Sequence, residues 1–249
     1  MEPLKDDLVR ALYSRLEVRD AEGEDDSPRL TGHFAVFDEW TEINSVFEGH
    51  FMERIAPGAF KKTMKERAND IKVTFNHGRD VLGDQVLGPI EVLREDDTGA
   101  YYEVRLLNGI PELLLNGLRA GQYGASFRFG VIREEFNREA KPSRHNPAGL
   151  PERTLEELRL HEFGPVTFPA YPEATAEMRS LTDSYMLSRA LEQPDLLSKA
   201  LARAAALPEV EPSEQEQETA EQDTPLVASR STQRPVKDYL GKRDATWRL

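Results

Sequence analysis

Cysteine is absent from this chain of 249 residues. Its absence excludes a disulfide framework, a catalytic thiolate and a zinc site held by cysteine, and it is compatible with a reducing compartment. Long apolar runs are absent as well, because no stretch approaches the roughly 18 apolar residues of a membrane-spanning helix. The opening sequence MEPLKDDLVRALYSRLEVRD is too charged for a secretory signal peptide. We therefore expect no association with membranes.

The motifs of several common binding sites are also missing. The five histidines include no pair at the helical HExxH spacing of a zinc site. No glycine-rich phosphate loop is present. The formal net charge of −13 argues weakly against a general nucleic-acid binder, which needs a basic stripe. We therefore expect no metal, no other cofactor and no direct contact with nucleic acid.

Composition divides the chain into four parts. Only 39% of the residues are hydrophobic, so part of the chain is expected to carry no core. The parts are a charged arm (1–27), a region rich in alternating apolar positions (28–180), a segment with helical apolar spacing (181–206) and a tail expected to be disordered (207–249). Within the tail, residues 207–225 hold seven Asp/Glu and no Lys/Arg, and the end of the chain is basic. The tail is either a tethered peptide with a role or solvated disorder.

The region 28–180 reads mainly as β-strands joined by short connections. Two helices are expected within it, at residues 57–67 and 110–121. This pattern favours an antiparallel β-barrel or sandwich with flanking helices over alternating strands and helices. The expected strands are 29–37, 70–77, 88–96, 99–107, 123–132 and 155–172.

The stretch GQYGASFRFG raises the question of a nucleophile. Alternation places Phe127 and Phe129 on one face of a strand and Ser126 with Arg128 on the other. The sequence is not GxSxG, because Arg128 replaces the second glycine, and a strand differs from the strand-to-helix elbow of esterases and lipases. Taken alone, Ser126 is a polar position on a strand, and it becomes a nucleophile only with a base within reach.

A base and an orienting acid can be sought in two further segments. His77 ends the expected strand 70–77 on the face of Val73 and Phe75, where a histidine is usually structural. Glu162 falls on an apolar face of the strand 155–172, and a carboxylate there is costly unless it is paired. Its neighbour His161 falls on the opposite face. A salt bridge at the strand edge is the alternative reading for Glu162.

Four local patterns occur in a defined order: ERIAPGAF, FNHGRDVLG, YGASFRF and LHEFGPVTFPAYPEA. Together they make residues 28–180 resemble the HK97-type phage prohead protease family, capsid-maturation serine peptidases related in fold to herpesvirus assemblins. The resemblance implies an assemblin-like barrel and a catalytic set of His77, Ser126 and Glu162. In assemblins the third member is a histidine, so His161 is a rival. Assemblin-like sites use an arginine near the oxyanion, which makes Arg128 an auxiliary candidate.

The resemblance also implies a substrate and a setting. The substrate would be scaffold, or the scaffold-like delta domain of the major capsid protein, cleaved inside the procapsid in the host cytoplasm. The enzyme would cleave itself as well, and a homodimer is expected by resemblance. The tail would then be scaffold-like, a docking segment or a site of self-cleavage. The competing hypothesis is a non-catalytic β-domain that acts as a chaperone or scaffold of capsid assembly.

Overall fold

A computed structural model describes residues 5–12, 16–20, 27–79, 85–167, 179–192 and 198. The expected disordered tail lies outside the described residues. The strands are β1 (Leu8–Leu12), β2 (Glu17–Arg19), β3 (Arg29–Val36), β4 (Thr41–Ser45), β5 (Gly49–Ile55), β6 (Lys72–Val73), β7 (Ile90–Glu95), β8 (Gly99–Arg105), β9 (Gly124–Asn137), β10 (Glu152–Val166) and β11 (Arg179–Ser180). The helices are α1 (Lys61–Arg67), α2 (Glu112–Arg119), α3 (Thr182–Glu192) and the short 3-10 helix η1 (Asn76–Gly78). No helix in these ranges is long and apolar enough to cross a membrane.

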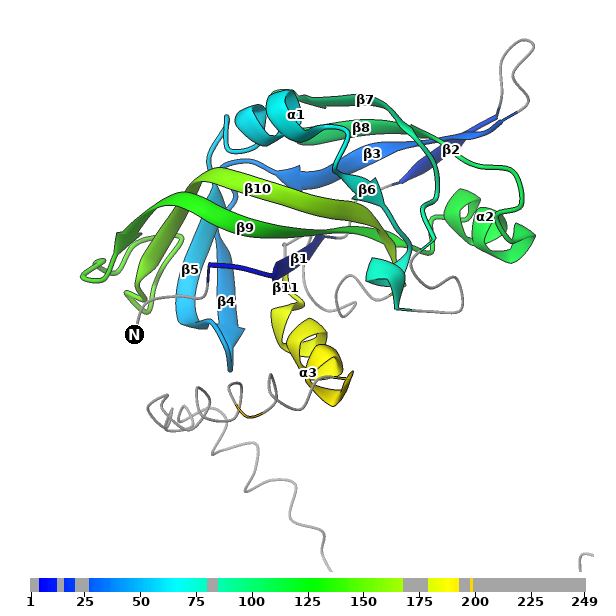
Figure 1. Ribbon diagram of the computed structural model, residues 1–249. Helices are drawn as coiled ribbons and strands as arrows, with labels where there is room; N and C mark the ends of the chain where they lie inside the picture. The colour runs from blue at the N-terminus through cyan, green and yellow to red at the C-terminus, as the bar shows by residue number, and fades with distance from the viewer. Residues whose placement is uncertain are drawn as a thin grey trace, which may run out of the picture. The chain divides into compact units, whose positions relative to one another are not determined.

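The strands form two sheets. The larger has the order β11-β1-β9-β10-β5-β4, with β6 also paired to β10, and the smaller has the order β2-β3-β8-β7. Figure 1 shows β9 and β10 running side by side along their length. The mainly β class is therefore confirmed, with three α-helices beside the sheets in the part of the chain that the structure describes.

The expected closure into an antiparallel barrel is wrong for the described strands. They remain in two separate sheets, and β10 pairs with β5 and with β6 in parallel. Alternating apolar residues show that a strand has a buried face, but they do not specify which strand lies beside it. β10 carries three register shifts against β9, and such irregularities bend a strand locally.

A cluster of fully buried phenylalanines joins the two sheets. Phe34 of β3 stacks on Phe163 of β10 with ring centroids 4.7 Å apart and lies 5.5 Å from Phe127 of β9. Phe60, just before α1, meets Phe34 edge to face at 5.3 Å. Aromatic rings bury large apolar areas, so this cluster fixes the strands that carry the site.

Two local predictions are confirmed. The expected strands 88–96 and 99–107 correspond to β7 and β8, which pair as a hairpin in which the amide of Asp96 donates to the carbonyl of Gly99 at 2.9 Å. The helix expected at 110–121 corresponds to α2, and Gly121 follows its end with a φ of +66°, which glycine adopts without strain. The helix expected from residue 57 begins four residues later, at Lys61.

β1 lies in the charged N-terminal arm, yet all five of its residues are buried. It pairs with β9, and Arg10 forms ion pairs of 2.7 Å with both Glu48 and Glu53. Burial lowers the pKa of Arg10, but the two carboxylates more than offset this and raise it. Arg153 of β10 contacts Glu53 at 3.2 Å, so one buried ionic network ties β1 to the strands beside it.

Candidate active site

Ser126 lies on β9, flanked by β1 on one side and β10 on the other. Its cross-strand partners are Ala11 and Gly164. The position opposite must be glycine, because a Cβ at Gly164 would lie 1.9 Å from the carbonyl oxygen of Thr74. The Ser126 hydroxyl lies 2.8 Å from Nε2 of His77. The sheet therefore brings together two residues that are 49 positions apart in the chain.

His77 lies on a turn and not at the end of a strand. β6 ends at Val73, and His77 sits in η1 with a φ of +59°, so the expected shared strand face with Val73 and Phe75 is wrong. A positive φ is uncommon outside glycine and is concentrated at functional sites. Asn76 anchors the turn, since its side chain donates to Thr167 Oγ1 at 3.1 Å and accepts from the Thr167 amide at 2.9 Å.

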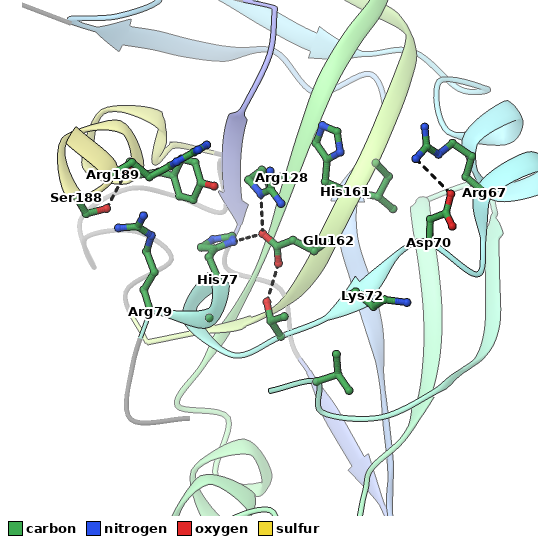
Figure 2. Close-up of a pocket in the computed structure, with 15 residues that line it drawn as sticks. Arg67, Asp70, Lys72, His77, Arg79, Arg128, His161, Glu162, Ser188 and Arg189 are labelled. Carbon is green, nitrogen blue, oxygen red and sulfur yellow. Dashed lines mark hydrogen bonds and ion pairs between the residues drawn. The ribbon is translucent and has the colours of Figure 1, made fainter. Parts of the chain in front are cut away.

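Glu162 is hydrogen-bonded to the second ring nitrogen of His77. Its Oε1 accepts from Nδ1 of His77 at 2.6 Å and its Oε2 accepts from the hydroxyl of Thr74 at 2.7 Å, as Figure 2 shows for the His77 pair. Burial raises the pKa of Glu162, but the hydrogen bonds from His77 and Thr74 outweigh it and leave the pKa below its usual value. When ionised Glu162 accepts a hydrogen bond from the Nδ1–H of His77, the lone pair of the ring lies on Nε2, which can then accept from Ser126.

His161 does not occupy the place of Glu162. It is half-buried, and burial together with the charge of Arg128 lowers its pKa. Arg128 on β9 is the cross-strand neighbour of Glu162 on β10, and its Nε lies 3.6 Å from Oε1 of Glu162. Its Nη1 lies 2.8 Å from Oδ1 of Asp7. The guanidinium therefore adds positive charge beside Glu162, and its role at an oxyanion stays a prediction.

The side chain of Ser126 is inaccessible to solvent in this structure. Its Oγ lies 2.8 Å from the backbone carbonyl of Arg10 as well as from His77. A carbonyl only accepts, so the Arg10 carbonyl and Nε2 of His77 compete for one hydroxyl proton. A substrate can reach Ser126 only after part of β1 or its neighbours has moved.

A cavity of about 1040 Å³ opens beside His77 and Glu162. Tyr185 of α3 reaches into it, with its ring centroid 6.2 Å from that of His77. Among the described residues, no group of three acidic or histidine side chains is placed to hold a metal. The cationic side chains that line the cavity are Arg67, Lys72, Arg79, Arg128 and Arg189 (Figure 2).

Sequence reasoning missed three residues of this site: Thr74, Tyr185 and Asp7. In the expected strand 70–77, alternation places Thr74 on the face opposite Val73 and Phe75. Tyr185 fits the apolar spacing of the expected helical segment 181–206. Asp7 lies in the charged arm 1–27, outside the region 28–180 that carries the four ordered patterns. Nothing in their local sequence distinguishes them, because each joins the site through tertiary contacts.

A serine, a histidine and a carboxylate joined by hydrogen bonds on a mainly β scaffold define the arrangement of a serine peptidase. The family described as "Caudovirus prohead serine protease" matches residues 14–187, and the chain belongs to this family. The resemblance seen in the four ordered patterns is thereby confirmed, and the family is one of bacteriophage peptidases of capsid maturation.

A solved structure, the capsid assembly protease of bacteriophage T4, is similar to this chain at 17% sequence identity with a TM-score of 0.44. The match covers 67% of this chain and 98% of that protein. No curated protein matches the chain.

Proposed function

We propose that the chain is a serine endopeptidase of phage capsid maturation with Ser126 as nucleophile, His77 as general base and Glu162 as orienting acid. The observation that carries the proposal is the continuous hydrogen-bonded chain from Ser126 to His77 at 2.8 Å and from His77 to Glu162 at 2.6 Å. Membership of the prohead protease family supports it.

The reaction follows from the direction of these hydrogen bonds. Ser126 Oγ attacks the carbonyl carbon of a peptide bond while its proton passes to Nε2 of His77. The imidazolium then gives this proton to the leaving amine, and an ester on Ser126 remains. Water attacks the ester, His77 takes the proton from the water and returns it to Ser126 Oγ as the acid product leaves. Glu162 stays ionised in both steps, accepts from the Nδ1–H of His77 and stabilises the imidazolium.

The proposed substrates are scaffold, or the scaffold-like delta domain of the major capsid protein, and the protease chain itself. Cleavage would take place inside the procapsid in the host cytoplasm. The family description supports action on a prohead. A homodimer and an assemblin-like ancestry remain parts of this proposal.

A second candidate is a non-catalytic assembly chaperone or scaffold, and the full burial of Ser126 favours it. Co-expression of the chain with its capsid protein separates the two. Wild-type protein should shorten the capsid protein or scaffold, as read by intact-mass spectrometry, and Ser126→Ala should leave both intact, because loss of a nucleophile costs about a millionfold in turnover. Equal shell assembly without cleavage by either form would favour the chaperone.

A further inference from the structure

Two arginines that line the cavity, Arg128 and Arg189, already bind a carboxylate of the same chain. Oδ1 of Asp7 accepts from Arg128 at 2.8 Å, and Oδ2 accepts from Arg189 at 2.8 Å. The three side chains are only partly exposed, at 32% for Asp7, 25% for Arg128 and 28% for Arg189. Charge-assisted bonds of this kind are among the strong hydrogen bonds of proteins, and they remain open to exchange where solvent reaches them. The cluster is therefore a built carboxylate site with an occupant from the same chain.

The surroundings of this site are cationic. Five Lys or Arg side chains line the cavity, against the two carboxylates of Asp70 and Glu162. The ring of Tyr185 lies 5.7 Å from the guanidinium of Arg128 and 5.8 Å from that of Arg189, which holds the two like charges together. Such a concentration of positive charge in a chain of net charge −13 selects for an anionic ligand.

The distance from Ser126 to Arg128 matches the spacing of side chains along an extended peptide substrate. Arg128 follows Ser126 by two positions on the same strand, so their Cα atoms are about 6.6 Å apart and their side chains share a face. His77 and Glu162 line the same cavity as Arg128 and Arg189. An extended peptide with its carbonyl at Ser126 would place a side chain one or two residues from the scissile bond beside these arginines.

We propose that Arg128 and Arg189 form a subsite for an acidic side chain of the peptide substrate, and that Asp7 fills this subsite in the closed enzyme. The inference rests on the proposed protease function and names the class of its substrate. It also gives the N-terminal segment two contacts in one site, since the Arg10 carbonyl meets Ser126 while Asp7 meets the arginine pair. Opening the site then exchanges one carboxylate for another, which preserves the charge balance.

The test is cleavage of a peptide library, a tryptic or chymotryptic digest of a bacterial proteome, with the cut sites read by mass spectrometry. Wild-type protein should show Asp and Glu enriched about tenfold or more within two residues of the cut, as expected for a charge-assisted pair. Arg189→Gln should lose this enrichment, and Arg189→Lys should restore part of it. Arg133→Gln is the matched control, because Arg133 is an exposed arginine of β9 that pairs with Glu156 away from the cavity.

A second variant predicts a change in the opposite direction. Asp7→Asn removes the internal competitor, so kcat/KM for acidic peptides should rise several-fold while neutral peptides change less. A purely structural role of the Asp7 bridge predicts instead that Asp7→Asn and Arg189→Gln lower the cleavage of acidic and neutral peptides alike. That result, or cleavage without any acidic preference in the wild type, would overturn the inference.

Labelling with a fluorophosphonate separates this inference from the function on which it rests. Ser126 should react with the probe in the wild type and in Arg189→Gln, since the probe carries no acidic side chain. Labelling of Ser126 without acidic preference would refute the subsite alone. Absence of labelling and of all cleavage would refute the protease function and the subsite with it. A further result would also overturn the subsite: tight binding of single-stranded DNA that Arg189→Gln weakens, together with peptide cleavage that shows no preference for acidic residues. The arginines would then bind phosphate groups and not a substrate carboxylate.

Discussion

Replacing Glu162 with glutamine removes one charge from the site and keeps the shape of the side chain. Glu162 accepts from His77 and from Thr74 in the structure. A glutamine can turn its oxygen to His77 and its amide nitrogen to the Thr74 hydroxyl, or the reverse. In the first arrangement the tautomer of His77 is preserved and only the negative charge is lost. In the second the amide donates to Nδ1, which places a proton on Nε2 and leaves no acceptor for Ser126.

The two arrangements of the glutamine side chain should lower the rate by different factors. A carboxylate about 4 Å from the imidazolium, at an effective dielectric constant of about 20, stabilises it by about 4 kcal/mol, which corresponds to about 10³-fold in rate. The wrong tautomer in a Ser-His-Asp site lowers kcat by about 10⁴-fold. We therefore expect Glu162→Gln to lower kcat by between about 10³-fold and 10⁴-fold, with KM changed far less.

The assay is cleavage of a peptide substrate by purified protein, together with thermal unfolding to confirm that the variant is folded. Glu157→Gln is the matched control, since Glu157 also lies on β10 but pairs with the exposed Lys62 at 2.9 Å. It should retain activity within about twofold of the wild type, as expected for a surface ion pair. A Glu162→Gln enzyme that is folded and within tenfold of wild-type kcat would refute the orienting role of Glu162.

Three further predictions concern the support of the site. Thr74→Val removes the second hydrogen bond of Glu162 and should lower kcat about tenfold in steady-state kinetics, without loss of fold; unchanged kcat would contradict a positioning role. Gly164→Ala places a Cβ 1.9 Å from the Thr74 carbonyl and should destabilise the protein by about 1–3 kcal/mol in urea unfolding; full stability would contradict the register. Burial raises the pKa of Glu48, but Arg10 outweighs it and lowers the pKa, so the stability from this pair is present above the usual glutamate pKa and is lost as pH falls through the lowered value. Glu48→Gln should therefore cost about 3–5 kcal/mol at neutral pH. In urea unfolding, the difference in stability from wild type should narrow as the pH falls below the usual glutamate pKa; a difference independent of pH would contradict the ion pair.

The sequence was informative where structure depends on near neighbours. The strand that carries Ser126 was predicted because Phe127 and Phe129 alternate with polar residues, and the burial of both rings bears this out. Glu162 was singled out because a carboxylate on an apolar face needs a partner, and the structure places it against His77. Both inferences depend on period-two alternation, which a single strand displays by itself.

The sequence was uninformative where structure depends on distant partners. The left-handed turn at His77 follows from its tertiary setting, including the hydrogen bonds of Asn76 to Thr167, 91 positions away. The closure of the sheets was mispredicted because the parallel pairing of β10 with β5 and β6 leaves no mark on local alternation. β1 was overlooked because its buried Arg10 looks like surface charge until Glu48 and Glu53 are placed beside it.

The central claim is that Ser126 is the nucleophile, and the most direct test is to find the covalent adduct. Protein taken from the preparation that cleaves capsid protein is treated with a fluorophosphonate, digested and mapped by tandem mass spectrometry. The account predicts one modified serine, Ser126, and loss of both the adduct and the cleavage in His77→Ala. Continued cleavage with Ser126 unmodified, or cleavage by Ser126→Ala, would contradict it.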